Sequence, residues 1–237
     1  MQRRHLLNAL AVPMLASGCA LLPSPDGPAV QAPAGALLAD PSYPAIGAKW
    51  RVRVTERGFF RETVEERDIT AASVEFNGRR GYGLVTPVTT TVLDPASFNT
   101  MGSIEGGKVT VSCSPGEGPL SRPLWVGKVS DATYSLTDFS YGQTWNGARS
   151  RSRVTAFEDV TVPAGTFNAF RIEYDGGIGT SVDGGRGGRF YSPGIETKEV
   201  YWYAPGPKIV VKSVVSRLGS HHSGTGTTTT ELVRAPA

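Results

Sequence analysis

From residue 47 onward the chain alternates apolar and polar side chains, and this period of two limits its fold most. Trp50, Val52 and Val54 alternate with charged or hydroxyl residues, and similar runs recur as far as residue 233. A period of two places successive side chains on opposite faces of a β-strand, whereas a helix requires a period of 3.6. No run in this region has a convincing amphipathic helical period. The pattern therefore predicts strands.

Glycine, proline and asparagine separate these runs at short intervals, and Asn77-Gly78 is a dipeptide typical of tight hairpins. We expect strands at residues 50–54, 73–76, 82–85, 88–93, 108–113, 132–136, 144–145, 152–157, 167–174, 189–191, 199–203, 208–218 and 227–233. About ten to twelve strands with short connections predict an all-β, antiparallel meander with few or no helices. We expect one domain over residues 45–237, folded as a sandwich or as an open or flattened barrel.

The first 18 residues differ in character from the rest. Arg3 and Arg4 precede an apolar run at residues 6–16, which is shorter than the about 20 residues that cross a bilayer as a helix. A positive start, a short apolar run and small residues are typical of a secretory signal peptide. Residues 15–19, LASGC, resemble the lipobox of bacterial lipoproteins. The resemblance implies cleavage before Cys19 and a lipid anchor, with diacylglycerol and palmitate, on that cysteine.

Residues 19–44 follow as a segment rich in proline, alanine and glycine, with no periodic apolar pattern. Such segments favour extended polyproline geometry, at about 3.1 Å per residue. The composition predicts a tether between the lipidated Cys19 and the domain. An alternative is that Leu37, Leu38 or Tyr43 docks back onto the domain.

Charge and cysteine content exclude some classes of function. The chain has 24 Lys+Arg and 21 Asp+Glu, and loss of Arg3 and Arg4 with the signal peptide leaves 22 against 21. A near-neutral mature protein has no electrostatic basis for binding nucleic acid. With Cys19 lipidated, Cys113 has no cysteine to pair with. Its place in an alternating run predicts a half-buried strand residue and not a nucleophile.

The histidines and the glycine-rich loop give weak signals for a site. His221 and His222 are neighbours in a Ser/Gly/Thr-rich stretch, which predicts a solvated loop, because a metal would need further ligands. Residues 176–188 lack the lysine of a phosphate-binding loop, and the single Asp183 is too few for calcium. We interpret this stretch as a flexible hairpin loop.

The carboxylates and serines also give no catalytic pattern. Glu158 and Asp159 adjoin in sequence but would face opposite sides of a strand, whereas acid–base catalysis of glycoside hydrolysis needs two cooperating carboxyls. The chain has no GxSxG or SxxK motif. The sequence favours a protein that is not an enzyme, with no catalytic residue, cofactor or metal.

Two motifs in the second half resemble a known group of proteins. VPAGTF at residues 162–167 and WYAP at residues 202–205 are followed by a valine-rich strand. This pair is similar to one found in bacterial envelope proteins that lack an assigned activity. The resemblance implies a β-rich domain, commonly an open or flattened barrel, over about residues 124–218. It implies no functional residue.

Aromatic residues accompany the second motif. Trp202 would face the side of its strand opposite to Tyr201 and Tyr203. We expect Trp202 to be a core anchor and the tyrosines to form a wetter face. The alternative is an aromatic-lined pocket between residues 157 and 203.

Gly47 and Gly127 give a further, weaker pattern, because each opens a strand-like run and a glycine-containing turn follows later. This internal echo indicates a duplicated meander.

Together these patterns favour a non-catalytic envelope lipoprotein, a binding or structural module tethered to a membrane through lipid on Cys19. Its expected partners are the membrane and an apolar ligand or an envelope protein. One alternative is a carrier that holds an apolar, lipid-like ligand in a barrel cavity. Another is a hydrolase with dispersed carboxylates. Ala20, and not aspartate, follows Cys19. In a Gram-negative host this predicts the outer membrane, facing the periplasm.

Overall fold

The computed structural model describes residues 32–58, 61–120, 122–177, 181–184, 188–191, 196–218 and 226–236. All regular secondary structure within these ranges is β-strand. The strands are β1 (Lys49–Arg57), β2 (Glu62–Phe76), β3 (Arg79–Val85), β4 (Thr89–Leu93), β5 (Thr100–Glu105), β6 (Lys108–Glu117), β7 (Val129–Asp138), β8 (Gln143–Val162), β9 (Gly165–Gly177), β10 (Ser181–Gly184), β11 (Gly188–Tyr191), β12 (Glu196–Ala204), β13 (Ile209–Leu218) and β14 (Gly226–Arg234).

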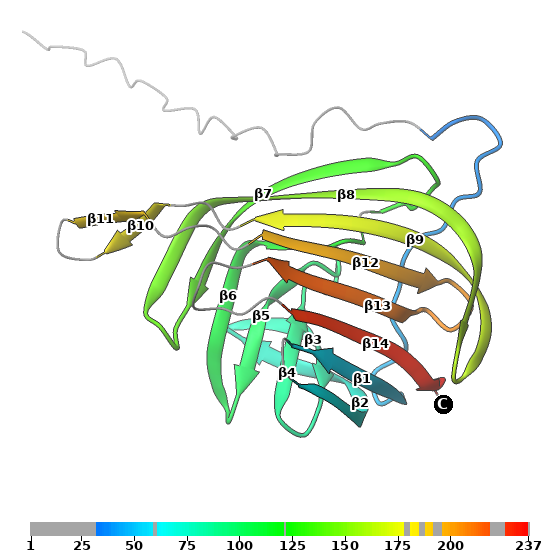
Figure 1. The fold of residues 1–237 in the computed structure, drawn as a ribbon, viewed down its shortest axis with the longest axis horizontal. Coiled ribbons are helices and arrows are strands. Elements are labelled where there is room, and N and C mark those ends of the chain that lie inside the picture. The colour runs from blue at the N-terminus through cyan, green and yellow to red at the C-terminus, as the bar shows by residue number, and fades with distance from the viewer. Residues whose placement is uncertain are drawn as a thin grey trace, which may run out of the picture.

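Twelve of these strands form one closed antiparallel barrel, in the order β1-β14-β13-β12-β9-β8-β7-β6-β5-β4-β3-β2 (Figure 1). Strands β10 and β11 pair only with each other. The all-β meander is therefore confirmed, and pairing of β1 with both β2 and β14 closes it. Strand β5 was not predicted from the sequence, and β8 was predicted as two runs at residues 144–145 and 152–157.

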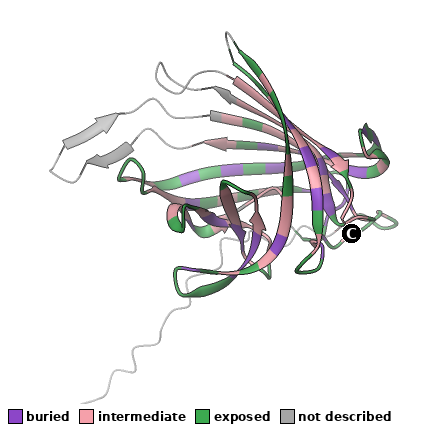
Figure 2. Ribbon diagram, turned by 90° about the horizontal axis from the view of Figure 1, so that it is seen from below, coloured by how far each residue is buried: buried purple, intermediate pink, exposed green. Residues whose placement is uncertain are grey.

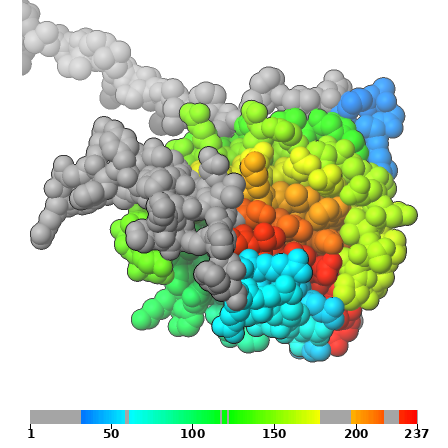
Figure 3. Space-filling model, in the orientation of Figure 1, coloured from blue at the N-terminus to red at the C-terminus, as the bar shows by residue number. Residues whose placement is uncertain are grey.

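The strand order defines two ends of the barrel. Because each strand is antiparallel to its neighbours, β1 and β7 run in the same direction and begin at the same end. We call this the entry end, and its connections include residues 43–48, 77–78, 94–99, 118–128, 163–164 and 205–208. The opposite, far end has the connections 58–61, 86–88, 106–107 and 139–142. For β8, β9 and β12–β14 the entry end lies to the right and the far end to the left in Figure 1, and Figure 3 gives the same view as a space-filling model.

Strand β1 shows how the alternation separates the two faces of the sheet. Trp50, Val52 and Val54 are buried on the inner face. The arginines between them point outward and pair with acids of β2: Arg51 Nη2 lies 2.8 Å from Asp68 Oδ2, and Arg53 Nη2 lies 3.1 Å from Glu66 Oε1. Such cross-strand pairs at the surface add little to stability individually. They hold the register that keeps the apolar residues of β1 inside.

The hairpin of β8 and β9 buries different faces along its length. Val154 pairs with Ile172, and both are buried on the inner face. The register shifts between Val154 and Ala156, and nearer the turn the buried Val160 pairs with Phe167. Since Phe167 and Ile172 point to opposite faces of β9, the end of the hairpin buries the other face. Figure 1 shows this hairpin curving at the entry end, and Figure 2 shows buried and exposed residues alternating along single strands.

Candidate functional site

The chain between the proposed anchor and β1 is built into the barrel from Ala39 onward. Ala39 and Leu124 form an antiparallel bridge, with N···O distances of 3.0 and 2.7 Å. The hydroxyl of Tyr203 accepts a hydrogen bond from the amide of Ser42 and donates one to its carbonyl, both at 2.8 Å. Pro41 is fully buried. We call residues 39–44 the strap, and its docking is the alternative stated above for Tyr43.

The strap ends in a cluster of aromatic rings inside the entry end. The ring of Tyr43 lies 5.4 Å from that of Tyr82 and 4.8 Å from that of Phe98, measured between centroids. The Tyr82 hydroxyl donates to the carbonyl of Pro44 at 2.8 Å. The guanidinium of Arg122 lies 4.5 Å from the centroid of Phe98, within cation–π range.

Burial keeps the hydroxyls of this cluster neutral. It raises the pKa of Tyr82 to about 12, and it raises the pKa values of Tyr43 and Tyr203 above the ordinary tyrosine value. A phenol with a raised pKa is a poor base near neutral pH. These hydroxyls therefore stay protonated near neutral pH and hold the strap through hydrogen bonds.

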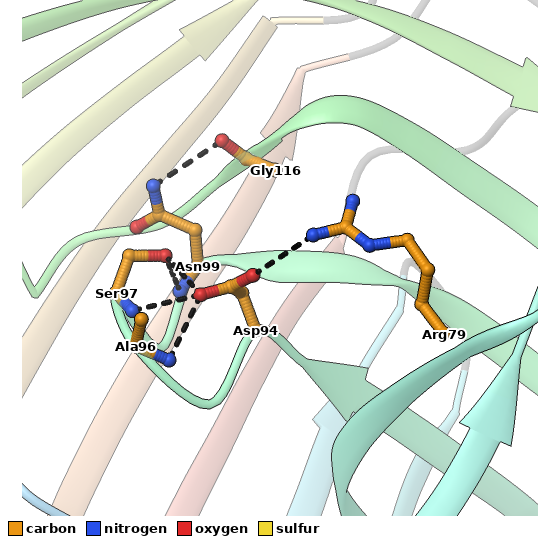
Figure 4. Close-up of polar contacts among 6 residues, drawn as sticks. All are labelled: Arg79, Asp94, Ala96, Ser97, Asn99 and Gly116. Atoms are coloured by element: carbon orange, nitrogen blue, oxygen red, sulfur yellow. Dashed lines mark hydrogen bonds and ion pairs between the residues drawn. The ribbon is translucent and has the colours of Figure 1, made fainter.

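The loop at residues 94–99 carries Phe98 into this cluster. Figure 4 shows the polar contacts that hold this loop. The carboxylate of Asp94 accepts hydrogen bonds from the amides of Ala96 and Ser97, each at 2.9 Å. The backbone hydrogen bond from Ser97 is the main cause that lowers the pKa of Asp94. Arg79 lies 3.6 Å from the same carboxyl group. Because it accepts hydrogen bonds from two backbone amides of its own loop, Asp94 holds the turn that presents Phe98.

The inner face near the far end is polar, in contrast to the apolar entry end. One lateral row of register partners crosses six strands there: Ser152, Tyr174, Glu199, Val215, Thr228 and Glu56. Ser150 and Ser152 are buried polar residues of this face. Tyr174 and Tyr201 stack edge to face with their centroids 6.4 Å apart, and the Tyr201 hydroxyl donates to Glu199.

This polar lining is the strongest candidate binding surface among the described residues. Hydroxyls and a carboxylate supply hydrogen-bond donors and acceptors, and tyrosine rings supply flat apolar area. These residues were not predicted as a group from the sequence. The alternation placed each one on a face of its own strand, but the lateral row depends on the register between strands.

Most of the residues predicted as chemical candidates are now located. Cys19, His221 and His222 lie outside the described residues. Cys113 lies in a strand, β6, as its alternating run predicts, but it is buried and not half-buried. The expectation of a loop over residues 176–188 is wrong in part, because β10 lies inside this range and pairs with β11. Backbone pairing of two glycine-flanked runs overrides the loop-like composition.

The two neighbouring carboxylates do face opposite ways. Glu158 pairs with Ala169 across the hairpin and accepts a hydrogen bond from Trp202 Nε1 at 2.8 Å. Asp159 pairs with Asn168 and accepts a hydrogen bond from its amide. In the part of the chain that the structure describes, no group of three His, Cys, Asp or Glu side chains could hold a metal ion.

The aromatic residues of β12 correct one prediction. Trp202 packs in a different cluster from Tyr201 and Tyr203, so the opposite faces are confirmed. The expectation that Trp202 is the core anchor and the tyrosines are wet is wrong, because Tyr203 is only 1% exposed and Trp202 is partly exposed. Lys212 lies 5.8 Å from the Trp202 ring centroid. The strap covers the tyrosine face, which explains the reversal.

Phe170 shows that the aromatic strands form core in this region. It is fully buried, and its ring centroid lies 4.7 Å from that of Phe157. Leu120 and Leu124, from the connection between β6 and β7, pack in the same apolar cluster as Phe170.

No helix within the described ranges is long and apolar enough to span a bilayer.

No family model matches this chain, and no curated protein matches it. Among solved structures, one similar chain is a "putative lipoprotein" from Parabacteroides distasonis, at 11% identity and a TM-score of 0.41, with 84% of this chain and 99% of that chain covered. Another is the hypothetical lipoprotein YmcC from Escherichia coli, at 9% identity and a TM-score of 0.40, with 78% of this chain and 87% of that chain covered.

Proposed function

We propose that this chain is a lipid-anchored protein of the bacterial envelope, and that its barrel is a non-catalytic binding or structural module. The lipobox-like residues 15–19 supply the anchor at Cys19. The strap supports the proposal, because the polypeptide that leads away from Cys19 is fixed to the barrel by Ser42, Tyr43 and Pro44. A module joined in this way has one defined attachment point to its membrane.

The polar lining of the far end is where such a module would bind its partner. Its hydroxyl and carboxyl groups suit a partner that forms hydrogen bonds, and Tyr174 and Tyr201 offer ring surface beside them. Among the described residues of this lining, the carboxylate of Glu199 already accepts a hydrogen bond from the hydroxyl of Tyr201. We therefore propose binding, without turnover, at this face.

Fractionation of cells tests the anchor. Cys19→Ala should release the protein from membranes, because no other cysteine near the start of the chain can accept diacylglycerol. Cys113→Ala is the matched control, and this variant should stay with the membranes. A Cys19→Ala protein that still fractionates fully with membranes contradicts the proposal.

The sorting proposal follows from the residue after the anchor. With Ala20 after the lipidated cysteine, the mature protein should enter the outer membrane of a Gram-negative host. Density-gradient separation of the two membranes reads this directly. Ala20→Asp should move the protein toward inner-membrane fractions, and a wild-type protein found with inner-membrane markers contradicts the sorting.

A carrier of an apolar, lipid-like ligand is the alternative module. Native mass spectrometry of protein extracted from membranes distinguishes the two, since a carrier retains a stoichiometric lipid-like mass. Phe170 and Tyr203 already pack against the protein's own side chains, which favours a partner at the polar face.

A further inference from the structure

The entry end of the barrel has several exposed aliphatic side chains close to the strap. Leu37 is 54% exposed, Leu38 55%, Ile46 56% and Val126 45%. The antiparallel bridge between Ala39 and Leu124 brings the segment that contains Leu37 and Leu38 beside the connection that contains Val126. Ile46 belongs to the turn that precedes β1, at the same end of the barrel. Exposed apolar side chains that gather in this way mark interaction sites.

The same end also has more basic than acidic residues. The comparison covers its connections and the two residues at the adjoining end of each strand. The exposed basic residues are Lys49, Arg79, Arg80, Arg122, Lys208 and Arg234, and the acidic residues are Asp40, Glu75, Asp94 and Glu117. Lys128 is not counted, because it is buried and its ammonium group donates to the carbonyls of Arg122 and Pro123. Counted in the same way without residues 178–195, the far end has Arg57, Arg61, Lys108 and Arg217 against Glu56, Glu62, Glu105, Asp138 and Glu196. Among the described residues compared in this way, the entry end is the one that combines exposed aliphatic side chains with a basic surplus.

The start of the chain limits what can cover this surface. Leu37 follows Cys19 by 18 residues in the sequence, a span of at most about 60 Å when fully extended. A short tether raises the effective concentration of the bilayer around the domain, so a weak contact is sufficient to orient it. Aliphatic side chains enter the headgroup region, and Lys and Arg beside them are attracted to anionic lipid.

We propose that the entry end is a membrane-contacting surface: Leu37, Leu38, Ile46 and Val126 enter the interface of the bilayer that holds the lipid anchor, with the basic residues around them facing anionic headgroups. The far end, with its polar lining, then points away from the membrane. This proposal rests on the lipid anchor of the proposed function, because the tether supplies the proximity that the contact requires.

Depth quenching in vesicles tests the orientation. The mature lipidated protein is reconstituted in vesicles of phosphatidylcholine and phosphatidylglycerol that contain a nitroxide lipid. An environment-sensitive fluorophore is attached to Leu38→Cys or to Val88→Cys, both in a Cys113→Ala background. Val88 is the matched control, because it is an exposed aliphatic residue (65%) at the far end.

The label at residue 38 should shift its emission to the blue and lose fluorescence to the nitroxide lipid, while the label at residue 88 does neither. With a label at Ile46→Cys, replacing Leu37, Leu38 and Val126 by serine should abolish the quenching, and vesicles of phosphatidylcholine alone should weaken it. Equal quenching at residues 38 and 88, or stronger quenching at 88, overturns the orientation. Mass spectrometry of the same vesicles detects the lipid on Cys19 separately, which distinguishes a failed anchor from a failed orientation.

Discussion

Tyr203 shows at the scale of one residue what the strap does. Its hydroxyl both accepts from and donates to Ser42, a residue 161 positions earlier in the chain. Tyr203 is 1% exposed, so it contributes to the stability of the fold through burial of its ring and through the hydrogen bonds of its hydroxyl. The period of two predicted that Tyr203 and Trp202 face opposite sides. It could not predict which side a distant segment covers.

Truncating Tyr203 should therefore destabilise the protein more than truncating Trp202. We expect Tyr203→Ala to cost about 3–5 kcal/mol, the range for a buried large aromatic residue. Trp202→Ala should cost clearly less, because Trp202 is partly exposed. Denaturant unfolding measures both, with Tyr141→Ala as the control, since Tyr141 is 78% exposed. A larger loss from Trp202→Ala than from Tyr203→Ala contradicts the role of the strap.

The raised tyrosine pKa values predict a loss of stability in alkali. Burial raises the pKa of Tyr82 to about 12, above the value of about 10 in an unfolded chain. The unfolded state then releases the proton first, so the stabilisation is complete below about pH 10 and is lost as the pH rises toward 12. The free energy of unfolding, measured from pH 9 to 12, should fall steeply. Tyr82→Phe should make this fall shallower, and an unchanged slope would count against neutral burial.

Single glycines decide local geometry at the scale of the element. Asn77 and Gly78, with φ of 48° and 73°, form the tight turn that the dipeptide predicted. Gly102 in β5 has φ of 152°, and a Cβ there would lie 2.1 Å from the carbonyl oxygen of Val111. The register of β5 against β6 shifts on both sides of this position. This irregularity weakens the alternation, which explains why β5 was missed.

Replacing Gly102 should therefore be costly. Gly102→Ala should destabilise the protein by about 1–3 kcal/mol or more, because the new methyl group overpacks against backbone and against Phe76. Gly206→Ala is the matched control, with open space around its Cβ, and should change stability by less than about 0.5 kcal/mol. Thermal melts of the two variants compare them. Equal melting temperatures would mean that β5 can move away from β6.

The β8–β9 hairpin shows where prediction from sequence stops for an element. Its strands and its turn at residues 163–164 follow from alternation and from Pro163 and Gly165. After the register shift near Val154, the opposite face of β9 is buried. Alternation alone does not predict this change, because the change depends on how the hairpin curves around the end of the barrel. The lateral polar row could not be predicted from the sequence either. Each of its pairs, such as Tyr174 and Glu199, is set by the register between two strands.

At the scale of the whole molecule the barrel consists of two six-stranded meanders that open with the same turn. Gly47 and Gly127 have φ of 95° and 96°. The amide of Gly47 donates a hydrogen bond to the carbonyl of Ala71 at 2.8 Å, and the amide of Gly127 donates one to the carbonyl of Val154 at 2.7 Å. The two turns thus share the same hydrogen-bond pattern. Each turn opens a meander of six strands, which agrees with the echo seen in the sequence. The closed barrel joins the two halves edge to edge and leaves none of its twelve strands unpaired.

The central proposal is that a lipid on Cys19 anchors this barrel to a membrane. Mass spectrometry of the mature protein, purified from the membranes of cells that express the full chain, tests it most directly. We predict an N-terminal peptide that begins at Cys19 and carries the mass of diacylglycerol on its sulfur, with or without a further acyl chain on its amine. An intact peptide that spans Gly18 and Cys19, or an N-terminus elsewhere with a free thiol at Cys19, would contradict the account.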